Sequence, residues 1–102
     1  MKIFLDDERS PATDDFIVCR DYYYFVDAVI EAGNNLSFIS FDHDLAHDET
    51  GLDCVKFLVS HDLDHDILTK EFTYYVHSQN PVGKKNIEGY LNNYLDTKFG
   101  AF

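Results

Sequence analysis

Short apolar runs recur along the chain, and polar or amphipathic segments separate them. The runs are rich in aromatic and β-branched side chains, which is the composition of strands buried in a sheet. The third run ends abruptly in Asp-His-Asp at residues 42–44, and its apolar character predicts burial on both faces of the sheet. The sequence therefore predicts strands over Lys2–Leu5, Phe16–Cys19, Phe38–Phe41 and Phe72–Val76.

Three segments carry apolar residues at helical spacing. Asp21 is a good N-cap for a first helix that runs to about Ala32. Thr50 and Asp53 have the form of a capping box that begins a second helix, and a third helix starts from about Lys84. The faces expected to pack on the sheet are Phe25, Val26, Val29 and Ile30 in the first helix, Leu52, Val55, Leu58 and Val59 in the second, and Ile87, Tyr90, Leu91, Tyr94 and Leu95 in the third.

Strands that alternate with helices predict an α/β fold with a small, open, mostly parallel four-stranded sheet and flanking helices. The connection between the first two strands is too short for a full crossover helix, so we expect them to be neighbours. Right-handed crossovers then give the strand order 2-1-3-4. With 102 residues, of which 45% are hydrophobic, the chain has the size of a single domain over residues 1–102.

Acidic residues dominate the charge, with 19 Asp and Glu against 8 Lys and Arg and a net charge of -11. Such a charge repels polyphosphate backbones and argues against binding of duplex nucleic acid. The first strand runs directly into Asp6 with no long apolar stretch or cleavage signal, so we expect a cytoplasmic protein without membrane insertion. Cys19 and Cys54 are isolated thiols on predicted core positions, typical of reduced packing residues.

Polar side chains cluster where the first, third and fourth strands stop. The carboxyl ends of parallel strands meet at one edge of a sheet, and functional groups gather there at the point where the strand order reverses. Each cluster alone would be unremarkable, but three at one edge indicate a site. We therefore expect one shallow pocket lined by Asp6, Asp7, Asp42, His43, Asp44, His77 and Ser78.

The carboxylates of this pocket repel one another and favour a bound cation. An all-oxygen ligand set favours magnesium, manganese or calcium over zinc, with magnesium as the default. The plainer interpretation is that Asp42 and Asp44 only cap the next helix or form an Asx turn. Because a second acidic cluster ends the first strand, we favour a divalent metal, magnesium or manganese, held by Asp6, Asp7, Asp42 and Asp44.

A phosphoryl group would suit such a metal site. Arg9, Ser78 and a lysine, for which Lys84 is the candidate, would offset the charge on its oxygens. Gly51 opens the second helix and either lets the backbone approach an anion at the helix N-terminus or merely relieves the turn.

Two histidines at the pocket are the candidates for proton transfer. Imidazole is the side chain that titrates near neutrality without special tuning, so His43 is the candidate general base and His77 the candidate general acid. With Asp42 and Ser78 they make up the expected catalytic set.

The stretch from Leu5 to Arg9, with Asp42, Gly51 and Ser78 each at or just after a strand end or helix start, resembles a shortened receiver domain of response regulators. That resemblance implies a truncated receiver or flavodoxin-like fold, an acidic pair that binds magnesium, an aspartate that takes a phosphoryl group, and a hydroxyl and a lysine that read it out. The chain lacks a full first crossover helix and a clear fifth strand, so Lys84 and Lys85 are both candidates for the lysine.

A fuller set of motifs resembles a more specific family. The motifs are Leu-Asp-Asp-x-Arg-x-Pro, Asp-His-Asp-Leu, Thr-Gly and His-Ser-x-Asn-Pro-x-Gly-x-x-Asn, between Leu5 and Asn86. They resemble the receiver-like family of cyclic-phosphate processing receiver domains. The resemblance implies action on cyclic nucleotide phosphates and adds Asn80 and Asn86 to the expected phosphate-binding residues.

Three functions stay open at this point. The first is a metal-dependent phosphoesterase that processes a cyclic phosphate of a nucleotide or an RNA end, with a small phosphorylated or cyclic nucleotide as its ligand. The second is a signalling module phosphorylated on Asp42, and the third is a protein that binds a phosphorylated ligand or a partner without chemistry. The segment from His61 to Asp66 is expected to be a solvated connector, with a surface metal site as the alternative. The sequence leaves the oligomeric state open.

Overall fold

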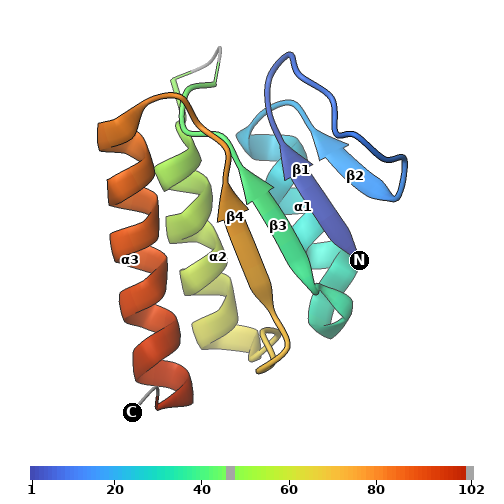
Figure 1. Ribbon diagram of the computed structural model, residues 1–102. Helices are drawn as coiled ribbons and strands as arrows, with labels where there is room; N and C mark the ends of the chain where they lie inside the picture. The colour runs from blue at the N-terminus through green and yellow to red at the C-terminus, as the bar shows by residue number, and fades with distance from the viewer. Residues whose placement is uncertain (46–47, 101–102) are drawn as a thin grey trace.

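The computed structural model describes residues 1–45 and 48–100, and its four strands form one parallel sheet in the order β2-β1-β3-β4 (Figure 1). The predicted fold class and strand order are therefore confirmed. The strands are β1 (Lys2–Leu5), β2 (Phe16–Cys19), β3 (Phe38–Phe41) and β4 (Thr73–Val76). The helices are α1 (Tyr22–Ala32), α2 (Gly51–His65) and α3 (Pro81–Phe99), with a short 3₁₀ turn, η1 (Gly33–Asn35), after α1.

All three helices cover the same face of the sheet, so the molecule has two layers (Figure 1). The crossovers through α1 and α2 both step in the same direction across the sheet, and right-handed crossovers in one direction place their helices on one side. The third strand is nevertheless largely buried on both faces, as predicted, because Ser40 on the uncovered side is 6% exposed and Phe38 is half-buried. We call the uncovered side the open face, and its strand residues are Lys2, Phe4, Phe16, Val18, Phe38, Ser40, Thr73 and Tyr75.

Local capping explains where the helices begin and end. The Asp21 side chain accepts a hydrogen bond from the Tyr24 amide, and the capping box of Thr50 and Asp53 is formed on both sides, as predicted. The third helix begins at Pro81 instead of Lys84, because the Asn80 side chain accepts from the Gly83 amide and a proline suits the first helical turn.

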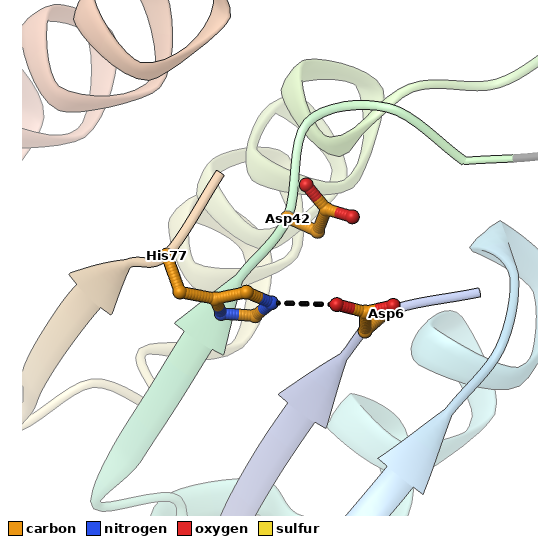
Figure 2. A group of neighbouring side chains, drawn as sticks. All are labelled: Asp6, Asp42 and His77. Carbon is orange, nitrogen blue, oxygen red and sulfur yellow. Dashed lines mark hydrogen bonds and ion pairs between the residues drawn. The ribbon is translucent and has the colours of Figure 1, made fainter. Parts of the chain in front are cut away.

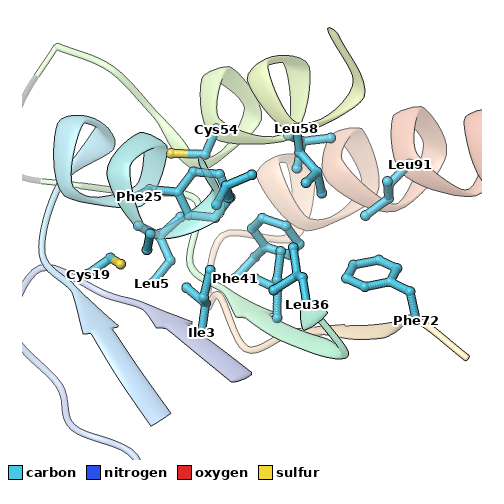
Figure 3. Packing of buried hydrophobic residues seen from close by; sticks show 14 of the residues in the cluster. Ile3, Leu5, Cys19, Phe25, Leu36, Phe41, Cys54, Leu58, Phe72 and Leu91 are labelled. Carbon is cyan, nitrogen blue, oxygen red and sulfur yellow. The ribbon is translucent and has the colours of Figure 1, made fainter. Parts of the chain in front are cut away.

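The core lies between the helices and the covered face of the sheet (Figure 3). On α1 the prediction was partly wrong, because Ile30 is 54% exposed while two alanines of the same helix are buried. On α3, Tyr90 is 41% exposed. In α1 the helix packs through a face of alternating large and small residues, which a search for large side chains alone does not find. The buried hydrophobic side chains of the helices are Phe25, Ala28, Val29, Ala32, Cys54, Val55, Leu58, Val59, Ile87 and Leu91.

The two cysteines are free and buried, in agreement with the prediction that they are packing residues. Burial raises the pKa of Cys19 to about 12, so its thiol is un-ionised at neutral pH. The helices in the described part of the chain are all too short or too polar to cross a bilayer.

Candidate functional site

The backbone ladder continues one residue past the ends of β1, β3 and β4. The Asp6 amide donates to the Cys19 carbonyl, the Asp42 amide to Leu5, and the His77 amide to Phe41. This pairing places Asp6, Asp42 and His77 in one row, where Figure 2 shows them beside one another. One ligand atom from each lies within 4.8 Å of the others, so the sheet edge brings together groups from three distant parts of the sequence.

Asp6 is the fully buried member of this row and accepts several hydrogen bonds. Its Oδ1 accepts hydrogen bonds from the Glu8 amide (2.9 Å) and the Arg9 amide (2.8 Å), and its Oδ2 accepts from Arg9 Nε (2.8 Å) and His77 Nε2 (3.0 Å). Burial alone would raise the pKa of Asp6, but these donors together lower it below the ordinary value. Asp6 is therefore an ionised carboxylate at neutral pH.

Arg9 supplies the positive charge between the two buried carboxylates. Besides its bond to Asp6, its terminal nitrogen lies 3.4 Å from Asp42 Oδ2. Burial acts to lower the pKa of Arg9, but Asp6 and Asp42 together raise it above the ordinary value. Arg20 steadies the same loop by donating to the Asp6 and Arg9 carbonyls and to the Ser10 hydroxyl. The Arg9 guanidinium is thus a protein cation that already contacts both buried carboxylates of the site.

His77 uses both ring nitrogens. Nε2 faces Asp6, while Nδ1 lies 2.7 Å from the hydroxyl of Ser40, a buried residue two positions before Asp42 on the open face. Because the ionised Asp6 can only accept, Nε2 carries a proton and donates to it. The ring also stacks on Phe4, with 4.6 Å between centroids and 5° between planes. These contacts fix the orientation of His77.

A pocket of about 420 Å³ opens beside this row. It contains carboxylates from both acidic clusters, the guanidinium of Arg9 and the hydroxyl-bearing residue Ser78, so its lining is strongly polar. The structure thus brings all four predicted acidic residues to one pocket. The lining residues are Asp6, Asp7, Glu8, Arg9, Asp42, Asp44, Leu45, Ser78 and Gln79.

His43 lies outside the pocket lining. Its Nδ1 is 3.0 Å from Asp44 Oδ1, and its ring packs against the start of α3 at Gly83. A Cβ at Gly83 would lie 2.3 Å from His43 Cγ, so the glycine is required for this close approach. The hydrogen bond from His43, followed by that from Asn80, lowers the pKa of Asp44, which sits at the rim instead of among the clustered ligand atoms.

The other predicted phosphate-binding residues have structural contacts. The Gly51 amide donates to the His43 carbonyl (2.8 Å), and a Cβ there would lie 2.0 Å from the Asp42 carbonyl oxygen. The Asn80 side chain caps α3, and the Ser78 hydroxyl accepts from the Asn80 amide. Gly51 and Asn80 thus hold the ends of α2 and α3 at the pocket.

The basic and amide residues of α3 lie away from the pocket lining. The Lys84 ammonium is 5.7 Å from the centroid of the Tyr75 ring on the open face, and Lys85 and Asn86 are exposed on the helix. The structure therefore does not bring these three residues to the acidic row.

Two residues of the site were missed from the sequence, although a signal existed. Arg20 directly follows β2, at the same sheet edge as the acidic clusters. Ser40 is a polar residue within an apolar strand, and the two-residue period of a strand places it on the same face as Asp42.

The carboxylates suit a divalent cation. Asp6 and Asp42 offer oxygens within reach of one ion, with His77 Nε2 beside them, and Asp7 adds a third carboxylate to the pocket lining. The position that such an ion would occupy is close to the Arg9 guanidinium, which contacts both Asp6 and Asp42.

Comparisons with curated proteins and with solved structures find no match. The family described as the cyclic-phosphate processing receiver domain matches residues 1–93. The match spans all four strands, both acidic clusters and most of α3. The chain therefore belongs to the family of cyclic-phosphate processing receiver domains.

Proposed function

We propose that the protein is a metal-dependent phosphoesterase that opens the cyclic phosphate of a small nucleotide or of an RNA end. The observation that carries this proposal is the convergence of Asp6, Asp42 and His77 beside a polar pocket that also holds Arg9. Carboxylates to bind a cation, a guanidinium to bind phosphate oxygens and an imidazole to transfer a proton are the groups that phosphate ester hydrolysis needs.

Asp6 and Asp42, with Asp7 at the pocket wall, would hold the metal, for which magnesium or manganese suits the oxygen ligands. When bound, the metal neutralises charge on the phosphate oxygens. Arg9 is 44% exposed at its side chain and can turn from the carboxylates to a phosphate oxygen, where its fork of donors fits well. The Ser78 hydroxyl offers a further donor at the pocket wall.

His77 is the proton donor in this proposal. Ser40 holds Nδ1, so Nε2 is the nitrogen that faces Asp6 and Asp42. Water attacks phosphorus and forms the new P–O bond while Asp42 accepts the proton of that water. One ester P–O bond of the ring breaks, and the leaving oxygen takes the proton from His77 Nε2. His43 then has a positioning role at the turn between Asp42 and Asp44, in place of the general base expected from the sequence.

The test is an assay of the purified protein against cyclic mononucleotides, cyclic dinucleotides and RNA with a 2',3'-cyclic end, with and without magnesium or manganese. His77→Ala should lower turnover about 10²–10⁴-fold, the usual cost of losing a positioned acid. The matched control is His65→Ala, an exposed histidine at the far end of α2. Binding of a cyclic phosphate without turnover under every condition would replace the enzyme with a binding protein.

One observation favours a second candidate, a receiver that is phosphorylated on Asp42. Asp42 is 5% exposed beside Arg9, Ser78 lines the same pocket, and His43 and His77 do not line it. Acetyl phosphate or a kinase would then label wild type, His77→Ala and His43→Ala alike. Labelling of that kind, with no turnover of any cyclic phosphate, would establish the receiver function in place of the phosphoesterase.

A further inference from the structure

The open face and the acidic row are parts of one continuous surface. Strand side chains alternate, so Phe4 and Asp6, Ser40 and Asp42, and Tyr75 and His77 project to the same side. In register, Val18, Phe4, Ser40 and Tyr75 form the row directly before the site, and the spacing of strands puts the Tyr75 and Asp42 backbones about 8 Å apart. A ligand held at the site by its phosphate is therefore within reach of this row.

The aromatic rings of the open face are unequally available. Phe4 stacks on His77 and meets Phe16 edge to face at 5.9 Å, and Phe16 meets Phe38 at 6.0 Å. These three phenylalanines are half-buried against one another. Tyr75 is 57% exposed and stands on the edge strand next to Ser40. Among the described residues of the open face, Tyr75 thus carries the most exposed ring, with Lys84 Nζ 5.7 Å from its centroid. One exposed ring suits one planar partner better than a broad apolar interface.

Basic side chains border the open face, although the adjoining site is acidic and Lys2 pairs with Asp15 at 2.7 Å. The chain as a whole carries -11, yet four of its eight basic residues border this face and the site. Lys84 lies 5.7 Å from the Tyr75 ring, Lys2 lies 4.5 Å from the Phe16 ring, and Arg9 and Arg20 stand at the site end. On the four strands, the open face carries no acidic side chain before the site row.

We propose that the open face binds the base of the nucleotide, with Tyr75 as the ring on which the base stacks. The inference rests on the proposed function, since the phosphate at Asp6 and Asp42 fixes where the base can lie. Every base has a π-face, so stacking on Tyr75 selects ligands with a base without reading which base it is. Lys84 adds a positive charge at the same ring. The substrate class is then a cyclic-phosphate nucleotide, and not a cyclic phosphate on a sugar alone.

Calorimetry with two probes tests this. The probes are adenosine 2',3'-cyclic phosphate and the base-free methyl ribofuranoside 2',3'-cyclic phosphate. The wild type should bind the nucleotide more tightly. Tyr75→Ala should weaken the nucleotide about 5- to 100-fold, the range for one lost stacking contact, and leave the base-free probe unchanged. Tyr75→Phe should keep the wild-type preference, and Tyr24→Ala, which removes a tyrosine that is 65% exposed on α1, is the matched control.

Three outcomes overturn the inference, and they differ from one another. If the protein binds both probes equally and turns both over, the base does not stack on Tyr75, and the proposed phosphoesterase function is retained. Failure of both probes to bind or react removes the proposed function and the base contact with it. Sedimentation that shows a dimer in the wild type and a monomer in Tyr75→Ala shows that a second copy of the chain covers the open face.

Discussion

Two buried aspartates, Asp6 and Asp62, stand in similar surroundings at opposite ends of the fold. Each is almost completely buried, accepts a hydrogen bond from a backbone amide and forms an ion pair with a basic side chain. At Asp62 the partners are the Leu68 amide (2.7 Å), the Tyr94 hydroxyl and Lys98 Nζ (2.7 Å). Lys98 in turn contacts Asp66 and the Leu68 carbonyl. We call these five residues the α2–α3 cluster.

In both regions two carboxylates share one cation, and the difference lies in how deeply the second carboxylate is buried and in what lies beside the pair. Asp6 shares the partly exposed Arg9 with the buried Asp42, and the pair borders a polar pocket. Lys98 joins the buried Asp62 to the exposed Asp66, and the pocket beside them is mostly apolar. A buried carboxylate with a basic partner is therefore not in itself a site. Two buried carboxylates that share one partly exposed cation beside a polar pocket are a candidate site.

Among the variants that test this comparison, we expect the largest effect from Asp42→Asn. Loss of the acceptor for the proton of water, and of one metal ligand, should lower cyclic-phosphate turnover by about 10²–10⁴-fold while the protein stays folded. Steady-state kinetics and thermal melting measure the two effects. Asp64→Asn, an exposed aspartate on α2, should leave both unchanged. Turnover within a few-fold of wild type in Asp42→Asn would remove Asp42 from the site.

We expect Asp62→Ala to lower stability and to leave turnover unchanged, which is the reverse of the effect of Asp42→Asn. The substitution removes the acceptor of a buried amide, a hydroxyl and an ammonium, so it should lower the free energy of unfolding by about 3 kcal/mol. Urea denaturation measures this, with Asp64→Ala as the control. At a temperature where the variant is folded, its turnover of cyclic phosphate should equal that of the wild type. Loss of turnover in the folded variant would show that the α2–α3 cluster contributes to the reaction.

The same two regions show which parts of the structure could be predicted from sequence. Strands, caps and the acidic row follow from local signals and from the rule that parallel strands end at one edge, so Asp6 and Asp42 were placed correctly beside one another. The prediction that His61 to Asp66 is a solvated connector was partly wrong: residues 63–66 are exposed, but α2 continues to His65 and Asp62 is 2% exposed. Its partners Tyr94 and Lys98 lie 32 and 36 residues away, beyond any local pattern.

Within the site, the contacts that sequence could not give are also the most distant ones. His77 meets Asp6 across 71 residues and Ser40 across 37. The sequence placed His77 at the correct edge, but which nitrogen faces which partner depends on side-chain packing against Phe4. The position of His43 against Gly83 likewise depends on where α3 docks, which no local signal specifies.

Arg9→Ala tests whether the guanidinium and the metal compete for the same carboxylates. In the wild type, magnesium or manganese at tenfold its dissociation constant should stabilise the fold by about 1.4 kcal/mol and so raise the melting temperature by several degrees. Arg9→Ala should melt lower without metal and show a larger metal-induced rise, because Arg9 no longer contacts Asp6 and Asp42. Arg9→Ala combined with Asp42→Asn should show little rise. A smaller rise in Arg9→Ala than in the wild type would show that Arg9 assists the metal.

The smallest expected effect is in the pH dependence of stability. Burial raises the pKa of Asp62, but the Leu68 amide, Lys98 and Tyr94 outweigh it, and the pKa of Asp62, like that of Asp6, lies below its ordinary value. A carboxyl whose pKa is lower in the folded state stabilises the fold above its unfolded pKa of about 3.9, and this contribution is lost as the pH falls toward the folded pKa.

The free energy of unfolding of the wild type should therefore exceed that of Asp62→Asn by a constant amount near neutral pH, and by less below about pH 4. We expect the same pH dependence for Asp6→Asn. Magnesium separates the two regions, because an ion bound at Asp6 holds that carboxylate ionised to lower pH and has no contact with Asp62. Urea denaturation across this pH range measures both differences in unfolding free energy. With metal, the difference between wild type and Asp6→Asn should begin to decrease at a lower pH. The difference between wild type and Asp62→Asn should decrease at the same pH as without metal. An equal shift of both would mean that magnesium acts on the net negative charge of the whole protein, and not at the Asp6 and Asp42 site.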